Sequence, residues 1–291
     1  GRLGAVGPDP LVRRAGGPRR DGAPRRRPRG DRARGAGPGG GARRRATLRP
    51  AGPALRGGSN PRPRGAAGGL GSELVRGLLN RGAWVFALTH KRSLSFKHER
   101  LIQLSLDLLE LDNLKGQLDS AFVDIQHPLG GVIHAAGITH GSPIAKTTLE
   151  EWDNQFNVNF FSAKIITEWG IQKMCEKNVA GHFIFVGSHA GAHGSAGQIA
   201  YATSKGCLQG LVAAYSKEFG SLGMRFHLVL PGFMETSMTK GLSDKTIKDY
   251  LDLQSIGEFT TPEASAEFIL FLLKTKNVSG QIFKLDSRLN F

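Results

Sequence analysis

Short apolar runs alternate with longer amphipathic segments along residues 65–291. The apolar runs predict six strands, at Ala83–Leu88, Leu101–Leu106, Gly130–Ala135, His182–Val186, Arg225–Leu230 and Gln281–Leu285. The amphipathic segments predict helices at Ser72–Asn80, Thr148–Lys177, Tyr201–Phe219 and Pro262–Lys274. Strict alternation of strand and helix favours right-handed crossovers. We therefore expect an α/β fold, with a single doubly wound (Rossmann-type) parallel sheet and helices on both faces.

Residues 1–64 differ from the rest in composition. They hold 18 Arg, 3 Asp and no Lys, and their net charge of +15 equals that of the whole chain. They also lack Ile, Phe, Tyr and Trp, which predicts a disordered segment. We therefore divide the chain into a disordered segment, 1–64, and a dinucleotide-binding domain, 65–291.

Three interpretations of residues 1–64 remain open. An Arg-rich tail can bind nucleic acid by charge, and an Arg-rich, acid-poor N-terminus is also typical of an organelle transit peptide. The third interpretation is that the segment is not genuine protein sequence. Arg, Gly, Pro and Ala share GC-rich codons, and the chain begins with Gly. We base no function on it and do not expect nucleic-acid binding.

The first predicted helix begins in a glycine-rich loop, Gly65-Ala66-Ala67-Gly68-Gly69-Leu70-Gly71. Such glycines let the backbone approach a phosphate, and a helix N-terminus supplies free N–H groups. A buried central strand should precede this loop, but residues 57–64 read GGSNPRPR. Two prolines and two arginines are incompatible with a central strand, so we expect the first strand to be missing or replaced.

The residues after the strand Ala83–Leu88 bear on the choice of cofactor. Where NAD-binding proteins have a carboxylate, this chain has Thr89, His90, Lys91 and Arg92. Cations there suit the 2′-phosphate of NADP(H), so NAD(H) is the less favoured cofactor. The alternative is a solvated basic turn.

Ser188, Tyr201 and Lys205 form the strongest candidate site. Of the three tyrosines, only Tyr201 is followed by Lys four residues later, which places both side chains on one helix face. An ammonium about 4 Å away stabilises a phenolate by about 4 kcal/mol, enough to bring the pKa of Tyr201 from about 10 to about 7. Ser188, at the end of a predicted strand, would hydrogen-bond a substrate carbonyl. The alternative is an exposed Tyr–Lys pair without chemistry.

Two other chemistries are excluded near Ser188. A hydrolase G-x-S-x-G motif needs Gly at position 186, where Val186 stands. His189 and His193 have the spacing of zinc ligands, but four surrounding glycines predict a loop, without the Glu of a metalloprotease helix.

Six ordered motifs resemble the short-chain dehydrogenase/reductase family, with the greatest similarity to 3-oxoacyl-acyl-carrier-protein reductases. These are GAAGGLG at 65–71, HAAG at 134–137, VN at 158–159, GS at 187–188, YATSK at 201–205 and PGFMETSM at 231–238. The resemblance implies that Asn159 joins Ser188, Tyr201 and Lys205 in a catalytic tetrad. It implies NADP(H) contacts from Gly65, Gly69, Leu70, Gly71, Thr89, His90, Lys91, Asp107, Leu108, Ala135, Ala136, Gly137, Tyr201, Lys205, Pro231, Gly232, Phe233 and Thr236. His134 replaces the more usual Asn of its motif, and Asp107 could equally be a strand-end cap.

The resemblance further implies NADPH-dependent reduction of a ketone, with Tyr201 as general acid. The favoured substrate is a 3-oxoacyl thioester of fatty-acid synthesis, small or carrier-bound. Other ketones, such as steroids, sugars and diketones, remain open, as does a non-catalytic binding protein with a damaged first strand. We expect a homo-oligomer, a tetramer by resemblance. No apolar run approaches 18 residues, so no membrane span is expected; the default location is the cytoplasm, with an organelle matrix as the alternative.

Overall fold

The computed structural model describes residues 66–236, 239 and 242–288. The Arg-rich segment, Gly65 and the residues for which a missing or replaced first strand is predicted lie outside the described residues. Two questions about the N-terminal region therefore stay predictions: the domain division at residue 64 and the order of residues 1–64.

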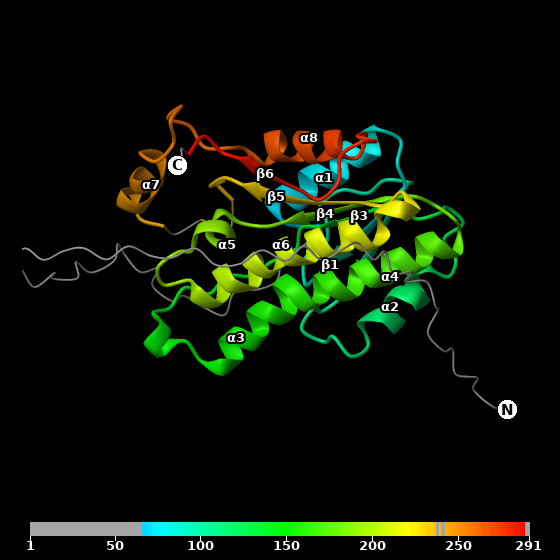
Figure 1. Ribbon diagram of the computed structural model, residues 1–291, viewed down its shortest axis with the longest axis horizontal. Helices are drawn as coiled ribbons and strands as arrows, with labels where there is room; N and C mark the ends of the chain where they lie inside the picture. Colours follow the sequence, from blue (N-terminus) through cyan, green and yellow to red (C-terminus); the bar gives the residue numbers. More distant parts are fainter. Residues whose placement is uncertain (1–65, 237–238, 240–241, 289–291) are drawn as a thin grey trace, which may run out of the picture. The chain divides into compact units, whose positions relative to one another are not determined.

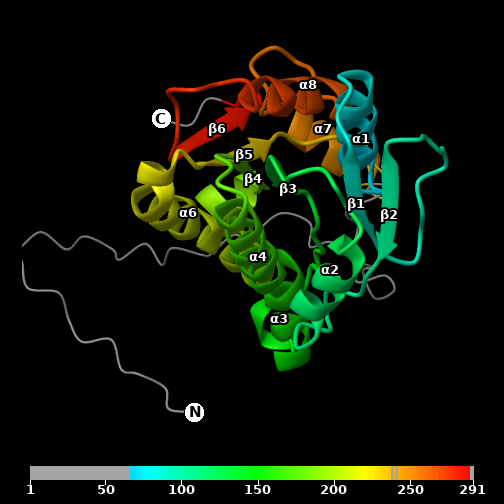
Figure 2. The same cartoon turned by 90° about the vertical axis from the view of Figure 1, so that its right-hand side faces the viewer.

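The strands form parallel sheets, as the alternating pattern predicts. They are β1 (Val85–Thr89), β2 (Leu101–Ser105), β3 (Gly131–His134), β4 (His182–Val186), β5 (Arg225–Pro231) and β6 (Gln281–Leu285). All strand pairs are parallel. Among the described residues, however, the strands form two sheets rather than one: β1-β2, and β3-β4-β5-β6. Figure 2 shows β1 beside β3, so the sheet is interrupted between them.

Helices cover both faces of the sheet, which confirms the α/β architecture. Helices α1 (Gly69–Asn80) and α8 (Pro262–Leu272) lie on one face. Helices α2 (Leu114–Phe122), α4 (Ser162–Glu176) and α6 (Ile199–Phe219) lie on the other (Figure 1).

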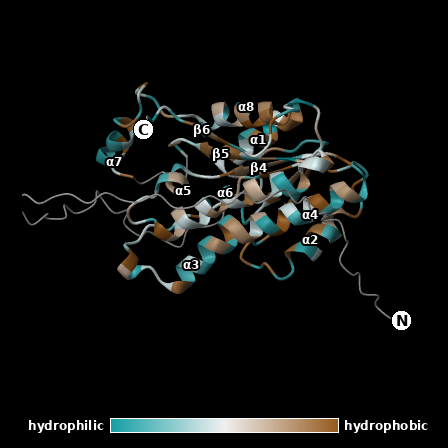
Figure 3. Cartoon of the chain, in the orientation of Figure 1, coloured by the Kyte–Doolittle hydropathy of each residue, from teal (hydrophilic) through white to brown (hydrophobic). Residues whose placement is uncertain are grey.

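The core follows the two-residue period of the strands. Phe183 and Phe185 of β4 belong to the cluster formed with α4 and α6, while Ile184 and Val186 belong to the cluster formed with α1 and α8. Both sides of β4 are therefore apolar, as expected of a strand buried between two helical layers. Figure 3 shows the polar residues mainly on the outer sides of the helices.

The predicted helix Thr148–Lys177 is not continuous. It consists of α3 (Leu149–Phe156), a π-helical segment (Asn157–Phe161) and α4. The capping box of Thr148 and Glu151 is present at its start.

Among the described residues, three α-helices lie outside the segments for which the pattern predicted a helix. They are α2, α5 (His189–His193) and α7 (Asp244–Leu251). The expectation of a plain loop at residues 189–193 is therefore wrong. Among the described residues, no helix is both long and apolar enough to span a bilayer.

Candidate active site

The predicted site residues converge on the carboxyl edge of the sheet. Ser188 follows β4, Gly137 lies shortly after β3, and Gly232 follows β5. Ligands of open parallel sheets bind at this edge, because the loops that follow successive strands meet there.

Ser188 and Tyr201 are brought together by two helices. Ser188 is the N-cap of α5, and its Oγ accepts a hydrogen bond from the backbone N–H of Ala190 at 3.2 Å. Tyr201 lies in the first turn of α6, where its phenol is hydrogen-bonded to Ser188. Burial raises the pKa of Tyr201, and the Ser188 hydrogen bond opposes this rise because it favours the phenolate.

Lys205 lies on α6 as predicted, but its ammonium is turned to the sheet. Nζ donates to the carbonyl of Val186 at 2.8 Å and to that of Ala136 at 3.3 Å. The side chain is buried, and burial lowers the pKa of Lys205 to about 8. The expectation that this ammonium lowers the pKa of Tyr201 therefore does not hold in this structure, where burial raises it.

Asn159 is fixed by three hydrogen bonds inside the protein. Its Oδ1 accepts from the N–H of Ile138 at 2.8 Å, and its Nδ2 donates to the Ile138 carbonyl and to Ser204 Oγ, both at 2.9 Å. It lies in the π-helical segment, and such bulges are frequent at functional sites. Gly137 makes room for it: a methyl group there would lie 3.3 Å from Asn159 Oδ1 and 3.1 Å from Lys205 Nζ.

Two residues of this corner, Ser204 and His134, were not among the predicted site residues. Ser204 is completely buried and links Asn159 to α6, since its hydroxyl donates to the carbonyl of Tyr201 at 2.9 Å. His134 is buried, with its Nε2 3.2 Å from Ser162 Oγ. Burial, together with the charge of Lys205, lowers the pKa of His134 to about 3, so its imidazole is neutral. The only sequence signal for these roles was position: Ser204 lies within YATSK, and His134 opens HAAG.

The glycine-rich loop has the features of a phosphate site. Gly68 is the N-cap of α1 and offers no side-chain hydrogen bond, and the first turn of α1 contains no acid. Gly69 lies against Thr236, because a methyl group there would be 3.2 Å from Thr236 Cγ2. Leu70 and Gly71 are buried within the helix. Among the described residues, no side chain caps the N–H groups at this end and no acid lies in the first turn, so the loop fits a dinucleotide phosphate.

Some of the cofactor contacts predicted at the ends of β1 and β2 make hydrogen bonds within the protein. Thr89 is buried, and His90 Nδ1 lies 3.1 Å from the carbonyl of Leu106. Lys91 and Arg92 are exposed. Asp107 accepts a hydrogen bond from the N–H of Leu109 at 3.1 Å, which is the strand-end cap foreseen as its alternative role.

The remaining predicted cofactor contacts lie after β3 and β5 and at Leu108. Leu108 and Ala136 are buried, whereas Ala135 is only half-buried. Pro231 ends β5, and Phe233 stacks on Tyr250 of α7, with ring centroids 5.0 Å apart. Phe233 thus connects α7 to the carboxyl edge.

The sequence matches the model of the short chain dehydrogenase family over residues 64–247. Since the match extends over more than half of the chain, this protein belongs to the short-chain dehydrogenase family.

Individual relatives agree with this assignment. The chain is similar to the 3-oxoacyl-acyl-carrier-protein reductase of Chlamydia muridarum, 34% identical over 157 residues that cover 53% of this chain and only 63% of that protein. It is similar to carbonyl reductase family member 4 of Danio rerio, 27% identical over 77% of this chain and 95% of the relative. A solved structure, 4-hydroxyisoleucine dehydrogenase complexed with NADH, matches with a TM-score of 0.73 at 22% identity, covering 77% of this chain and 96% of the other. That last likeness concerns the fold.

Proposed function

We propose that this protein is an NADP(H)-dependent carbonyl reductase that acts on a 3-oxoacyl thioester in fatty-acid synthesis. The observation that carries the proposal is the hydrogen-bonded pair of Ser188 and Tyr201, with Lys205 one turn along the same helix. The name of the Chlamydia relative supports the substrate class.

Each residue has a definite part in this reaction. When bound, the nicotinamide supplies a hydride to the carbonyl carbon. Tyr201 donates its proton to the carbonyl oxygen, and Ser188 hydrogen-bonds the same oxygen as negative charge develops on it. The raised pKa of Tyr201 keeps the phenol protonated and ready to act as an acid. Lys205 and Asn159, held to the backbone and to Ser204, order the floor of the site.

The cofactor preference follows from charge. The exposed Lys91 and Arg92 follow β1, and no acid stands between Thr89 and Arg92. A 2′-phosphate is therefore favoured over a free ribose hydroxyl. We further propose that the remaining predicted contacts hold the dinucleotide and that the protein acts as a homotetramer in the cytoplasm.

The test measures oxidation of NADPH with an acetoacetyl thioester, for the native chain and for Tyr201→Phe. General acid catalysis is worth about 10²–10⁴-fold, so the variant should lose at least about 100-fold in kcat. NADH should give a lower kcat/KM than NADPH. Equal turnover by both proteins would refute the assignment.

A second candidate function is a reductase-like binding protein without catalytic activity, and the interruption between β1 and β3 favours it. This candidate predicts no rise in melting temperature with NADPH. A binder at 100 times Kd should gain about 2.7 kcal/mol.

A further inference from the structure

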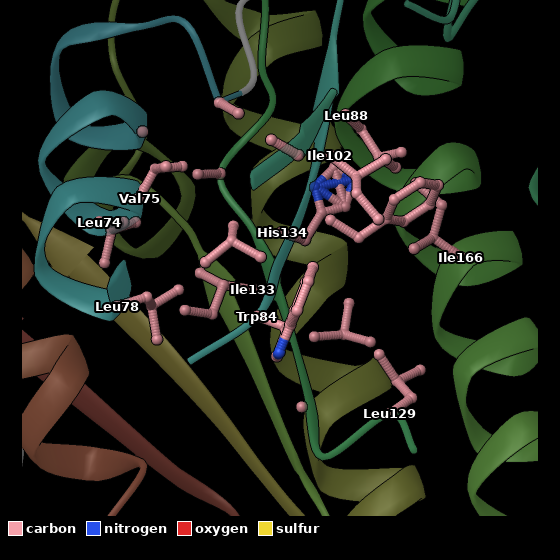
Figure 4. A pocket seen from close by; sticks show the side chains of 18 of the residues that line it. Leu74, Val75, Leu78, Trp84, Leu88, Ile102, Leu129, Ile133, His134 and Ile166 are labelled. Carbon is pink, nitrogen blue, oxygen red and sulfur yellow. The ribbon is translucent and has the colours of Figure 1, made fainter. Parts of the chain in front are cut away.

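An apolar cavity of about 590 Å³ separates the two parts of the sheet. Strand β1 lines one side and β3 lines the other. Leu74 and Leu78 of α1 close it from one face, and Ile166 of α4 closes it from the opposite face (Figure 4). The cavity therefore occupies the sheet layer itself, between the two helical layers.

The cavity runs along backbone edges rather than over a side-chain face. Every residue of 83–90 and every residue of 129–136 lines it. Successive side chains of a strand point to opposite faces, so a cavity over one face would be lined by alternate residues only. Contact with every residue shows that the two strands present their edges to the cavity.

The hydrogen-bonding groups on the β1 side alternate between β2 and the cavity. The N–H of Val85 donates to the carbonyl of Arg100 at 2.8 Å, so Val85 and Ala87 face β2. Phe86 and Leu88 consequently face the cavity. The N–H of Ala66 donates to the carbonyl of Leu88 at 3.2 Å and so begins a parallel pairing at the cavity's carboxyl end.

The β3 side follows the same rule. The N–H of His182 donates to the carbonyl of Gly130 at 3.2 Å, so Gly130 and Val132 face β4. Gly131 and Ile133 consequently face the cavity. Among the described residues, no strand pairs with these two inner edges.

We propose that the cavity is a strand-binding site for a segment of another polypeptide chain. The segment is extended, uncharged and apolar, about five residues long to match β1, and lies parallel to β1 and β3 so that the two parts of the sheet become one. Buried main-chain groups need partners, and a strand is the ligand that supplies them to both edges at once. The apolar residues of α1 and α4 select apolar side chains on both faces.

The chain's own residues do not suit the cavity. The Ala66–Leu88 hydrogen bond sets a register in which residues 61–65 would lie beside residues 84–88. Pro61 and Pro63 lack N–H groups, and two arginines would enter an apolar layer. The longest run in 1–64 without Arg or Pro is Leu3–Gly7, five residues of which two are glycine.

The test uses the full chain and hydrogen exchange of individual amides by NMR. The probe is the blocked peptide Val-Ile-Val-Val-Thr, and its control carries Pro at the second and fourth positions. At ten times Kd the probe should slow exchange about tenfold at Phe86, Leu88, Gly131 and Ile133. Ala87 and Val132, bonded to the neighbouring strands, should change little. The proline peptide should protect none of them.

Three results would overturn the proposal. One is the absence of protection. Another is a rise in melting temperature without the alternating pattern, which identifies the cavity as a site for small apolar molecules. The third is alternating protection before any peptide is added, which shows that residues of this chain fill the cavity. Amide hydrogen exchange does not depend on reductase activity. The test therefore remains valid even if the proposed reductase function is refuted.

Discussion

Burial of His134 beside the Lys205 ammonium makes stability depend on pH. Its pKa falls from 6.5 to about 3, so between these values the unfolded chain binds the proton and the folded chain does not. Stability therefore decreases as pH falls below 6.5. At pH 4.5, two units lower, His134 alone should cost about 2.7 kcal/mol relative to neutral pH.

The substitution His134→Asn should remove this acid loss. Asn can still hydrogen-bond Ser162 but does not titrate. Urea unfolding at pH 7.5 and 4.5 should show a decrease about 2–3 kcal/mol smaller in the variant than in the native chain. His98→Asn, in the turn before β2, is the control and should behave like the native chain. Equal acid losses for native and His134→Asn proteins would contradict the prediction.

The position of the Lys205 ammonium shows which features of a single residue can be predicted from the sequence and which cannot. The four-residue spacing correctly places Tyr201 and Lys205 on α6. The position of the ammonium, however, is set by the carbonyls of Val186 and Ala136, 19 and 69 residues away in the chain. A long side chain takes the partners that tertiary structure brings to it, and helical spacing does not identify them.

At the scale of elements, the packing of α5 against α6 positions the Ser188–Tyr201 pair. A methyl group at Gly191 would lie 2.9 Å from backbone atoms of Gly206 and Lys205, so only glycine permits this approach. Gly191→Ala should push α5, and Ser188 at its N-cap, away from Tyr201. Displacement by about 1 Å can cost about 100-fold in rate, which we expect in kcat of the proposed reduction.

Gly210→Ala, on α6, is the matched control. A methyl group at Gly210 meets nothing within 4 Å. This substitution should leave kcat unchanged and raise the free energy of unfolding by about 0.5–1 kcal/mol, because Ala loses less backbone entropy than Gly. Unchanged kcat in Gly191→Ala would show that α5 does not position Ser188.

Helices and strands could be predicted from the sequence where their buried residues form a clear apolar pattern. β4 and β5 are apolar on both faces and were located to within one residue. α2 was missed although Leu114 and Leu118, four residues apart, are completely buried. α5 has four glycines around it, and its Ser188 cap and its contact with α6 override that weak propensity. The π-helical turn that holds Asn159 leaves no periodic signal in so long a helix.

For the whole molecule, two prolines and two arginines before the glycine-rich loop predict that a normal first strand is absent, and this prediction concerns residues outside the described part of the chain. The sequence could not predict that, among the described residues, β1-β2 and β3-β4-β5-β6 would form two parallel sheets that do not pair with each other. That outcome follows from the helical layers, because α1 and α8 pack with β4, and α2 and α4 pack with the residues after β2. These contacts hold the two parts of the sheet without direct pairing between β1 and β3.

Supplying a strand within the chain should therefore stabilise the whole domain. The graft is Asn60→Val, Pro61→Ile, Arg62→Ala, Pro63→Val and Arg64→Thr. It leads directly into Gly65 and supplies N–H groups at positions 61 and 63, which would face β3 in the register set by the Ala66–Leu88 hydrogen bond. Several new backbone hydrogen bonds at about 1 kcal/mol each should raise the free energy of unfolding by at least about 2 kcal/mol in urea titrations.

A control graft that keeps Pro61 and Pro63 but carries the other three substitutions separates strand formation from loss of charge. It should gain little, because proline cannot donate to the edge of β3. The complete graft should also no longer bind the Val-Ile-Val-Val-Thr peptide, since both segments need the same two edges. Equal stability of the two grafts, or continued peptide binding by the complete one, would mean that the space between β1 and β3 does not accept a strand that leads into Gly65.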